Sequence, residues 1–308
     1  MERVKLKVPA TVANLVCGFD ILGLCLSDPY DVMELRLLNE RKVVIHNSGN
    51  SSLPTDPLLN TAGVPLLEMM AAVDDNTGFE VWIQKNIKPG SGLGSSAASA
   101  AGAVVAANLL LQNRFSKTDL VRFAMAGEKV ASGVKHADNV TPVIYGGITL
   151  VRSIFPLDIV PISSPPLFIT VVHPQIEVKT ADARQILRKE VLLKDAIRQW
   201  GNIAGLVAGL MKSDYDLIGR SLEDIIIEPL RSILIPEFKN IKQRCLSAGA
   251  IGGGISGSGP SIFMLSKDEQ TASAVEVVMK EIYNSISLHH YTYVTAVNGQ
   301  GCTILEQA

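Results

Sequence analysis

The feature that most constrains this chain is a glycine-rich stretch, PGSGLGSSAAS, at residues 89–99. Glycines alternate at 90, 92 and 94, and the small residues after them open an apolar segment that predicts a helix to about Leu111. Backbone N–H groups of such a turn can converge on a phosphate, and the helix N-terminus adds unpaired donors and its dipole. A tight strand-to-helix turn without a ligand has the same composition, so the loop alone leaves both interpretations open.

The loop departs from the common nucleotide-binding motifs. A dinucleotide fingerprint needs a third glycine where Ser95 stands, and an acidic residue about 20 positions later. A Walker loop closes with Gly-Lys-Ser/Thr, whereas two serines follow Gly94. The H-R-D and D-F-G motifs of protein kinases do not occur. What remains is generic phosphate binding, with the hydroxyl of Ser96 in reach of a phosphate or its magnesium.

Composition and charge narrow the class of protein. The 308 residues suggest about two domains, and 28 Lys and Arg are mixed with 30 Asp and Glu along the chain. No basic stripe of the kind that binds nucleic acid or an anionic membrane is visible. The N-terminus lacks the apolar core of a signal peptide, and the small, apolar residues 97–111 fall short of the ~18 needed to span a membrane.

The cysteines are scattered and form no C-x-x-C pair, which argues against a zinc ribbon and against a disulfide framework. They are Cys17, Cys25, Cys245 and Cys302. We therefore expect a cytoplasmic, soluble protein with reduced thiols, without nucleic-acid or membrane partners.

Apolar periodicity predicts a mixture of strands and helices in the first half of the chain. Strands are predicted in VKLKVPATV, DVMELRLL, KVVIHN, FEVWIQKNI and VIYGGITLV. Helices are predicted at residues 61–73, from the glycine loop to Leu111, and from Ser116 onward. Ser116 and Asp119 form a capping-box pattern that fixes the start of this last helix.

The second half begins after residues 153–166, a Pro- and Ser-rich stretch that suggests a domain boundary. Beyond it we predict a strand in LFITVVHP, helices between about 180 and 248, and a strand–turn–strand in GGGISGSGPSIFML. A helix at about 268–284 and closing strands follow. The predicted fold class is α+β, with two domains at residues 1–160 and 161–308.

Three motifs, taken together, resemble those of the galactokinase, homoserine kinase, mevalonate kinase and phosphomevalonate kinase (GHMP kinase) superfamily. They are PATVANLVCGFDILGLCL (9–26), PGSGLGSSAAS (89–99) and GGGISGSGPSIF (252–263), in matching order and spacing. The segments TDPLLNTAG, SGVKHADNVTPVIYGG and EPLRSILIPEF are similar to those of the homoserine kinases within it. The resemblance covers nearly the whole chain.

The resemblance implies a fold and an activity. The N-terminal nucleotide-binding domain would resemble ribosomal protein S5 domain 2, with a left-handed crossover, and the C-terminal domain would be ferredoxin-like. ATP would lie with its triphosphate over the glycine loop, and L-homoserine would lie between the domains. The reaction would give O-phospho-L-homoserine and ADP, a transferase step of threonine biosynthesis. A homodimer is expected.

The resemblance also assigns the nucleotide and metal sites. Asn60 is expected near adenine, and the triphosphate would lie along Pro89, Gly90, Ser91, Gly92, Leu93, Gly94, Ser95, Ser96, Ala97, Ala98 and Ser99. Ser96 and Glu128 match the magnesium contacts of the family. Helix periodicity alone favours a solvated Glu128 beside Lys129, whereas the resemblance favours a ligand.

Substrate residues follow from the same resemblance, because a zwitterion demands an arginine fork for its carboxylate and acceptors for its ammonium. The matching positions are Asn14, Asp20, His136, Asn139, Thr180, Arg184, Arg231 and Gly257. The small residues of the 252–263 motif would let the C-terminal domain approach the glycine loop, although a turn within a strand pair explains them equally well.

One position bears on mechanism. Relatives acting on mevalonate or galactose place an aspartate where this chain has Asn139, and an amide is no general base at neutral pH. We expect direct in-line transfer in which Ser96, Glu128 and Asn139 are the catalytic residues and Asn139 orients the hydroxyl. Asp138 keeps a base-assisted route open. Two alternatives remain: a kinase for another small alcohol, and a non-catalytic member used for binding or regulation.

Overall fold

The computed structural model describes residues 2–48, 53–73, 76–178 and 180–308. Its first sheet has the strand order β11-β1-β2-β4-β3, and the β5–β6 hairpin extends it because β5 pairs with β2. Within this sheet β3 and β4 pair in parallel, whereas the other pairs run antiparallel. The strands are β1 (Arg3–Ala13), β2 (Leu22–Leu38), β3 (Val43–Ser48), β4 (Gly78–Gln84), β5 (Ile148–Ile154), β6 (Leu157–Ile162) and β11 (Thr303–Gln307).

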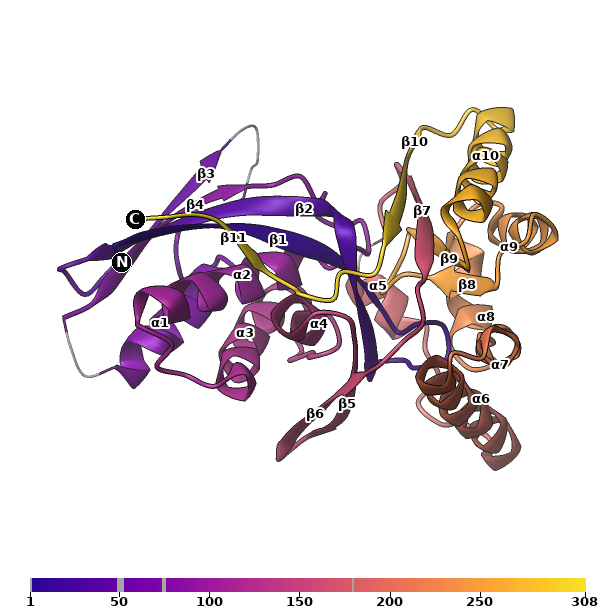
Figure 1. Ribbon diagram of the computed structural model, residues 1–308, viewed down its shortest axis with the longest axis horizontal. Helices are drawn as coiled ribbons and strands as arrows, with labels where there is room; N and C mark the ends of the chain where they lie inside the picture. Colours follow the sequence, from indigo (N-terminus) through magenta and orange to yellow (C-terminus); the bar gives the residue numbers. More distant parts are fainter. Residues whose placement is uncertain (1, 49–52, 74–75, 179) are drawn as a thin grey trace.

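Helices cover one face of this sheet (Figure 1). They are α1 (Gly63–Ala72), α2 (Ser95–Leu110), α3 (Lys117–Ser132) and α4 (Val140–Tyr145). Helix α2 is the central one, and its run of alanines is buried against β1 and its neighbouring helices. At Gly102 a Cβ atom would lie 2.8 Å from a methyl group of Val8, so the absence of a side chain permits the close approach. The predicted capping box of Ser116 and Asp119 is confirmed at the start of α3.

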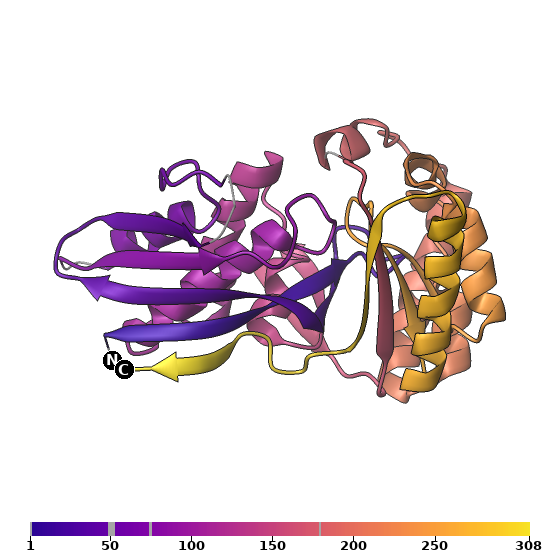
Figure 2. The same cartoon turned by 90° about the horizontal axis from the view of Figure 1, so that it is seen from above.

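The second sheet is antiparallel, with the order β10-β7-β9-β8. Its strands are β7 (Phe168–Pro174), β8 (Gly252–Ile255), β9 (Ile262–Ser266) and β10 (His290–Ala296). Its helices are α5 (Thr180–Gln185), α6 (Leu193–Lys212), α7 (Tyr215–Ser221), α8 (Glu228–Arg231) with the 3-10 turn η1 (Ser232–Leu234), α9 (Phe238–Ser247) and α10 (Glu269–Ser285). Figure 2 shows the long helices α6, α9 and α10 packed on the side of the second sheet that faces away from the first. The predicted α+β class is confirmed.

Two segments differ from the expected pattern. The strand expected over residues 143–151 begins only at Ile148, because the preceding apolar residues form α4 and Gly146 and Gly147 turn the chain with φ of +79° and +66°. A short apolar run fits a buried helix as well as a strand, which explains the error. The Pro- and Ser-rich stretch expected to mark a domain boundary contains β6, an edge strand on which Pro161 is tolerated because it pairs with β5 alone.

The last strand returns to the first sheet, where Val4 pairs with Gln307 and Lys5 with Glu306. The first sheet therefore takes strands from both ends of the sequence, as the neighbouring termini in Figure 1 show. One hydrophobic core joins residues of both sheets, among them Leu6 and Phe263.

The domain division at residue 160 stays a prediction. Within the described residues, no helix is long and apolar enough to cross a membrane.

Candidate active site

A pocket of about 590 Å³ is lined by residues from both halves of the chain. Most of the predicted site residues line it, and the structure thus brings together positions that are far apart in sequence. They are Asn14, Asp20, Pro89, Gly90, Gly92, Gly94, Ser95, Ser96, Ser99, Glu128, His136, Asn139, Arg184, Arg231 and Gly257.

The glycine loop needs its glycines for two physical reasons. Gly92 and Gly94 have φ of +81° and +66°, which side chains rarely adopt. A Cβ on Gly92 would also lie 2.6 Å from the carbonyl oxygens of Ser256 and Gly259, and a Cβ on Gly94 would lie 2.0 Å from Oγ1 of Thr11. Ser256 Oγ donates to the carbonyl of Gly92 at 2.7 Å. The expectation that the 252–263 motif approaches the glycine loop is confirmed.

Ser96, at the start of α2, lies beside Glu128 of α3. The Ser96 side chain lies close enough to the Glu128 carboxylate to lower its pKa, and Oε1 of Glu128 is buried without a partner among the described residues. Burial raises the pKa of Glu128 to about 7, against the opposing effects of Ser96 and of Lys85. The prediction of a solvated Glu128, which periodicity alone favoured, is wrong. Glu128 is instead buried and lines the pocket.

Lys85 is a pocket residue that the sequence reasoning missed. It forms an ion pair with Asp31, and its Nζ donates to the carbonyl of Ser95 at 2.8 Å and to Oγ of Ser99 at 3.1 Å. Burial lowers the pKa of Lys85, and Asp31 and Glu128 oppose that shift. The alternation of β4 contains the missed signal, because Lys85 follows Val81 and Ile83 on the inward face.

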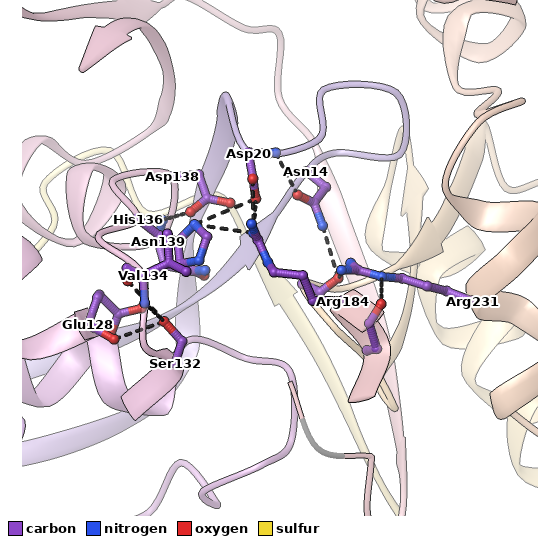
Figure 3. A network of polar contacts seen from close by, with 12 residues as sticks. Asn14, Asp20, Glu128, Ser132, Val134, His136, Asp138, Asn139, Arg184 and Arg231 are labelled. Carbon is purple, nitrogen blue, oxygen red and sulfur yellow. Dashed lines mark hydrogen bonds and ion pairs between the residues drawn. The ribbon is translucent and has the colours of Figure 1, made fainter. Parts of the chain in front are cut away.

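Asn139 is held by a strand residue beneath the glycine loop. Thr11 Oγ1 donates to Oδ1 of Asn139 at 2.7 Å, so the amide has N–H donors to offer to a ligand. The backbone N–H of Asn139 donates to Oδ1 of Asp138 at 3.1 Å. Burial, together with the charges of Asp20 and Glu128, raises the pKa of Asp138 to about 7. Figure 3 shows Asp138 and Asn139 close to His136 and Asp20.

The loop after β1 adopts a rare backbone. Asn14, Leu15, Val16 and Asp20 all have positive φ, a strained arrangement that is commonly found at functional sites. The Asn14 side chain stabilises it by accepting from the backbone N–H of Asp20 at 3.1 Å and by donating to the carbonyl of Gly257 at 2.9 Å. The loop thus fixes an amide and a carboxylate at the pocket wall.

The acidic and basic residues that are predicted to bind the substrate contact one another (Figure 3). Arg184 Nη2 donates to both carboxylate oxygens of Asp20, at 3.0 and 2.9 Å, and His136 Nδ1 lies 3.6 Å from Oδ1 of Asp20. Burial lowers the pKa of His136, the charge of Asp20 opposes this, and Arg184 and Arg231 add to it. A carboxylate ligand would therefore have to draw Arg184 partly away from Asp20.

Arg231 is the more rigid arginine. It is 4% exposed, and its guanidinium donates to the carbonyls of Ala183 and Gly257, both at 3.0 Å. Burial lowers its pKa, although the charge of Asp20 opposes the shift. Phe19 lies under both guanidinium groups, with its ring centroid 4.9 Å from Arg231 Cζ and 5.7 Å from Arg184 Cζ. Phe19 is a second pocket residue that the sequence reasoning missed.

A few predicted residues do not line this pocket. Leu93, Ala97 and Ala98 pack into the hydrophobic core, and the Ser91 side chain is buried and accepts from the backbone of Leu93. The amide of Asn60 is used by Pro54 and Ala62, and those contacts do not support its predicted role at adenine. Thr180 begins α5, but its side chain lies outside the described part of the structure.

Comparison with known proteins identifies the family of this chain. The chain matches the family models "GHMP kinases N terminal domain" over residues 62–147 and "GHMP kinases C terminal" over residues 206–285. A homoserine kinase of Chloroherpeton thalassium is 43% identical, over 99% of this chain and 100% of that protein. One of Methanococcus maripaludis is 41% identical, over 99% of each. The crystal structure of homoserine kinase from Cytophaga hutchinsonii has a TM-score of 0.94 and 45% identity, and the match covers 99% of this chain and 98% of that one.

The chain belongs to the GHMP kinase family and is an ATP-dependent kinase. The predicted resemblance and the predicted two-domain fold are thereby confirmed. Within the family, relatives that match this chain over 99% of its length at 40–44% identity are homoserine kinases.

Proposed function

We propose that the protein is a homoserine kinase, which transfers the γ-phosphate of ATP to the side-chain hydroxyl of L-homoserine. The products are O-phospho-L-homoserine and ADP, and the step belongs to threonine biosynthesis. One observation carries the proposal. The pocket with the glycine loop and the Ser96–Glu128 pair also contains Arg184, Arg231 and Asp20, the charges that a small amino acid requires. A cytoplasmic location stays a prediction.

The ATP side of the pocket consists of the glycine loop and the start of α2. The backbone N–H groups of the loop and the N-terminus of α2 would face the phosphates. The residues also fit Mg²⁺, because Ser96 and Glu128 offer hard oxygen ligands and Oε1 of Glu128 is buried without a partner among the described residues. Within the described part of the chain, no group of three or more His, Cys, Asp or Glu could hold a metal alone. This agrees with an ion bound mainly by phosphates and water.

When bound, Mg²⁺ would neutralise charge on the β- and γ-phosphates. Glu128 would hold it as a carboxylate. Ser96, beside that carboxylate, would offer a second oxygen ligand. Lys85 would keep the start of α2 in place by donating to the carbonyl of Ser95.

The acceptor side would bind homoserine by its two charged ends. Arg231, held by Ala183 and Gly257, and Arg184 would take the carboxylate. Asp20 would accept from the ammonium, with Asn14 holding it in position through the backbone N–H of Asp20. His136 lies beside Asp20 and Arg184 and would close that end of the site. Thr180 stays a predicted contact.

The transfer would proceed in line without a strong base. Thr11 occupies Oδ1 of Asn139, so Asn139 would donate to the substrate hydroxyl oxygen and fix its direction toward the γ-phosphate. A loose transition state depends mainly on positioning and charge stabilisation, and the proton can leave late, to the transferred phosphate. Asp138 has a raised pKa of about 7 and contacts the backbone of Asn139, so it would act chiefly on the position of Asn139.

Asp138→Asn tests this mechanism, because asparagine keeps the acceptor for the N–H of Asn139 and removes the ionisation. We expect kcat to fall less than about tenfold, since loss of a true general base costs typically ~10²–10⁴-fold. The acid limb of kcat/KM should be unchanged in a pH–rate profile. A fall of three decades together with loss of that limb, in a variant that still binds ATP and homoserine, would make Asp138 the base.

The function itself is tested by ADP release with purified protein, Mg²⁺ and ATP. We expect turnover that depends on L-homoserine, with mevalonate, galactose and L-threonine at background. Turnover with another alcohol instead would support a sibling kinase. Nucleotide binding without turnover on any acceptor would support a non-catalytic binding protein. Phosphate on the homoserine hydroxyl, seen by ³¹P NMR, identifies the product.

A further inference from the structure

Asp31 and Lys85 form an ion pair that is almost completely shielded from solvent between the two ends of the glycine loop. Asp31 lies on β2 and Lys85 follows the end of β4, and their side chains are 1% and 4% exposed. Removing two charges from water carries a desolvation penalty that their attraction often fails to offset, so such a pair is a poor source of stability. The contacts of this pair indicate a role in positioning the residues around it.

The carboxylate of Asp31 holds the chain where it leaves β4. Its Oδ1 accepts from the backbone N–H groups of Asn86 and Ile87, at 2.8 and 2.9 Å, and its other oxygen forms the ion pair with Lys85. The side-chain amide of Asn86 donates to the carbonyl of Tyr30 at 2.9 Å. These hydrogen bonds tie the segment before the glycine loop to β2.

Lys85 extends this anchoring to the far end of the loop. Its Nζ donates to the carbonyl of Ser95 at 2.8 Å and to Oγ of Ser99 at 3.1 Å, both at the beginning of α2. Oγ of Ser95 in turn donates to the carbonyl of Ile87 at 2.7 Å. Residues 87 and 95 are therefore joined through buried side chains, and residues 88–94 between them form a loop with fixed ends.

The contacts of the pair are confined to this loop and its neighbours. Asp31 does not line the pocket, whereas Lys85 does. Among the described residues, the hydrogen bonds of both side chains go to each other, to residues 86–87 and to the beginning of α2, and none reaches Asp20 or the pocket arginines. A loop whose ends are fixed loses less conformational freedom when it binds a ligand. The pair would thus favour binding of the phosphates and leave homoserine binding unchanged.

We propose that Asp31 and Lys85 are positioning residues for the phosphate groups of ATP. They hold the two ends of the glycine loop at a fixed spacing, so that the backbone N–H groups of the loop and of α2 face the phosphates before the nucleotide binds. The inference rests on the proposed placement of the triphosphate over this loop. If the pair only stabilised the fold, its loss would leave the nucleotide affinity of the folded protein unchanged.

The test compares a single with a double substitution. Lys85→Met keeps the length of the side chain and removes its donors, but it leaves Asp31 as a buried charge without its cation. Combining it with Asp31→Asn removes that charge as well, while asparagine keeps an acceptor for the N–H groups of Asn86 and Ile87. The free energy of unfolding should therefore fall in the single variant and recover in the double variant.

Nucleotide affinity should not follow this recovery. Isothermal titration calorimetry should show Kd for ADP at least about tenfold higher in both variants, because both lack the donors to Ser95 and Ser99. In the ligand-free protein, amide hydrogen exchange of residues 88–99 should be faster in both. KM for L-homoserine should change by less than about twofold. Recovery of ADP affinity together with stability would mean that the pair acts through the fold alone, and would overturn the proposal.

Two controls define the origin of the loss. ADP binding is measured with Mg²⁺ and again in EDTA, because the charge of Glu128 also acts on Lys85. We expect the loss in both conditions, and a loss confined to Mg²⁺ would refute a role in shaping the loop. Lys242→Met is the matched substitution, since Lys242 forms another partly buried ion pair, with Glu228. It should lower stability without changing ADP affinity or the exchange of residues 88–99.

Gly90→Asp separates failure of this inference from failure of the proposed function. A Cβ atom on Gly90 would meet nothing within 4 Å, and aspartate tolerates a positive φ better than most residues, so the substitution adds a negative charge to the loop at little cost to the fold. It should weaken ADP binding. Unchanged ADP affinity would refute the placement of the phosphates, and this inference with it. Weaker binding in Gly90→Asp with normal binding in Lys85→Met would refute the positioning role alone.

Discussion

Glu128→Gln should lower kcat at least a hundredfold while the fold survives. Glutamine keeps the size of the side chain and its position beside Ser96, but it removes the negative charge that would hold Mg²⁺ at the pocket. Losing one preorganised group that stabilises the charge of a transition state costs typically ~10²–10³-fold in kcat. The measurement is ADP release over a magnesium titration.

Ser96→Ala and Glu68→Gln are the controls for this result. Ser96→Ala removes a neighbouring oxygen without changing the charge, so its effect should be the smaller one. Glu68 lies on α1 and does not border the pocket, so Glu68→Gln should leave the rate unchanged. Near-normal activity of Glu128→Gln at limiting magnesium would remove Glu128 from the metal site.

The same substitution should stabilise the protein in the absence of ligands. An acid whose pKa rises from 4.5 to about 7 on folding binds its proton more tightly in the folded state, so the wild type loses stability as pH rises through that window. A shift of this size corresponds to roughly 3 kcal/mol as an upper estimate. Glu128→Gln should therefore raise the free energy of unfolding at pH 8 and leave it unchanged near pH 4. Only a functional carboxylate gives lower activity together with higher stability.

The sequence predicted most elements because their signals are local. The capping box of Ser116 starts α3, and the alternation in β1 and β4 predicts both strands. Long-range pairing has no such signal, and the addition of β11 to the first sheet beside β1 depends on a chain path that periodicity cannot define. The error at α4 arose because a short buried apolar run has no distinctive period.

The candidate site was predicted mainly by resemblance of motifs. The site residues that this prediction missed have one property in common. Thr11, Phe19 and Lys85 act through other residues: Thr11 holds Asn139, Phe19 lies under the arginines, and Lys85 holds the start of α2. Such supporting contacts depend on which strands and loops meet in space. Lys85 alone had a sequence signal, namely a charge on the buried face of an alternating strand.

Arg231→Ala should lower kcat/KM for homoserine by roughly 10- to 150-fold. The substrate carboxylate would lose a charged hydrogen-bond donor worth roughly 1.5–3 kcal/mol, and about 1.4 kcal/mol is a tenfold change. Arg231 should matter more than Arg184, because it is held in place by two carbonyl groups whereas Arg184 pairs with Asp20. KM for ATP should change by less than about twofold, because the hydrogen bonds of Arg231 go to Ala183 and Gly257 rather than to the glycine loop.

The structural part of the loss can be separated from the binding part. Removal of Arg231 also takes the guanidinium donor from the carbonyl of Ala183 and one of two donors from the carbonyl of Gly257, so Arg231→Ala should lower the melting temperature. Arg231→Lys keeps the charge but lacks the planar fork, and we expect it to recover part of the homoserine affinity. Arg122→Ala, at an exposed arginine on α3, is the matched control and should change neither constant. If Arg231→Ala weakened ATP and homoserine equally in a folded protein, Arg231 would belong to the phosphate site, and the proposed orientation of the substrate would have to be reversed.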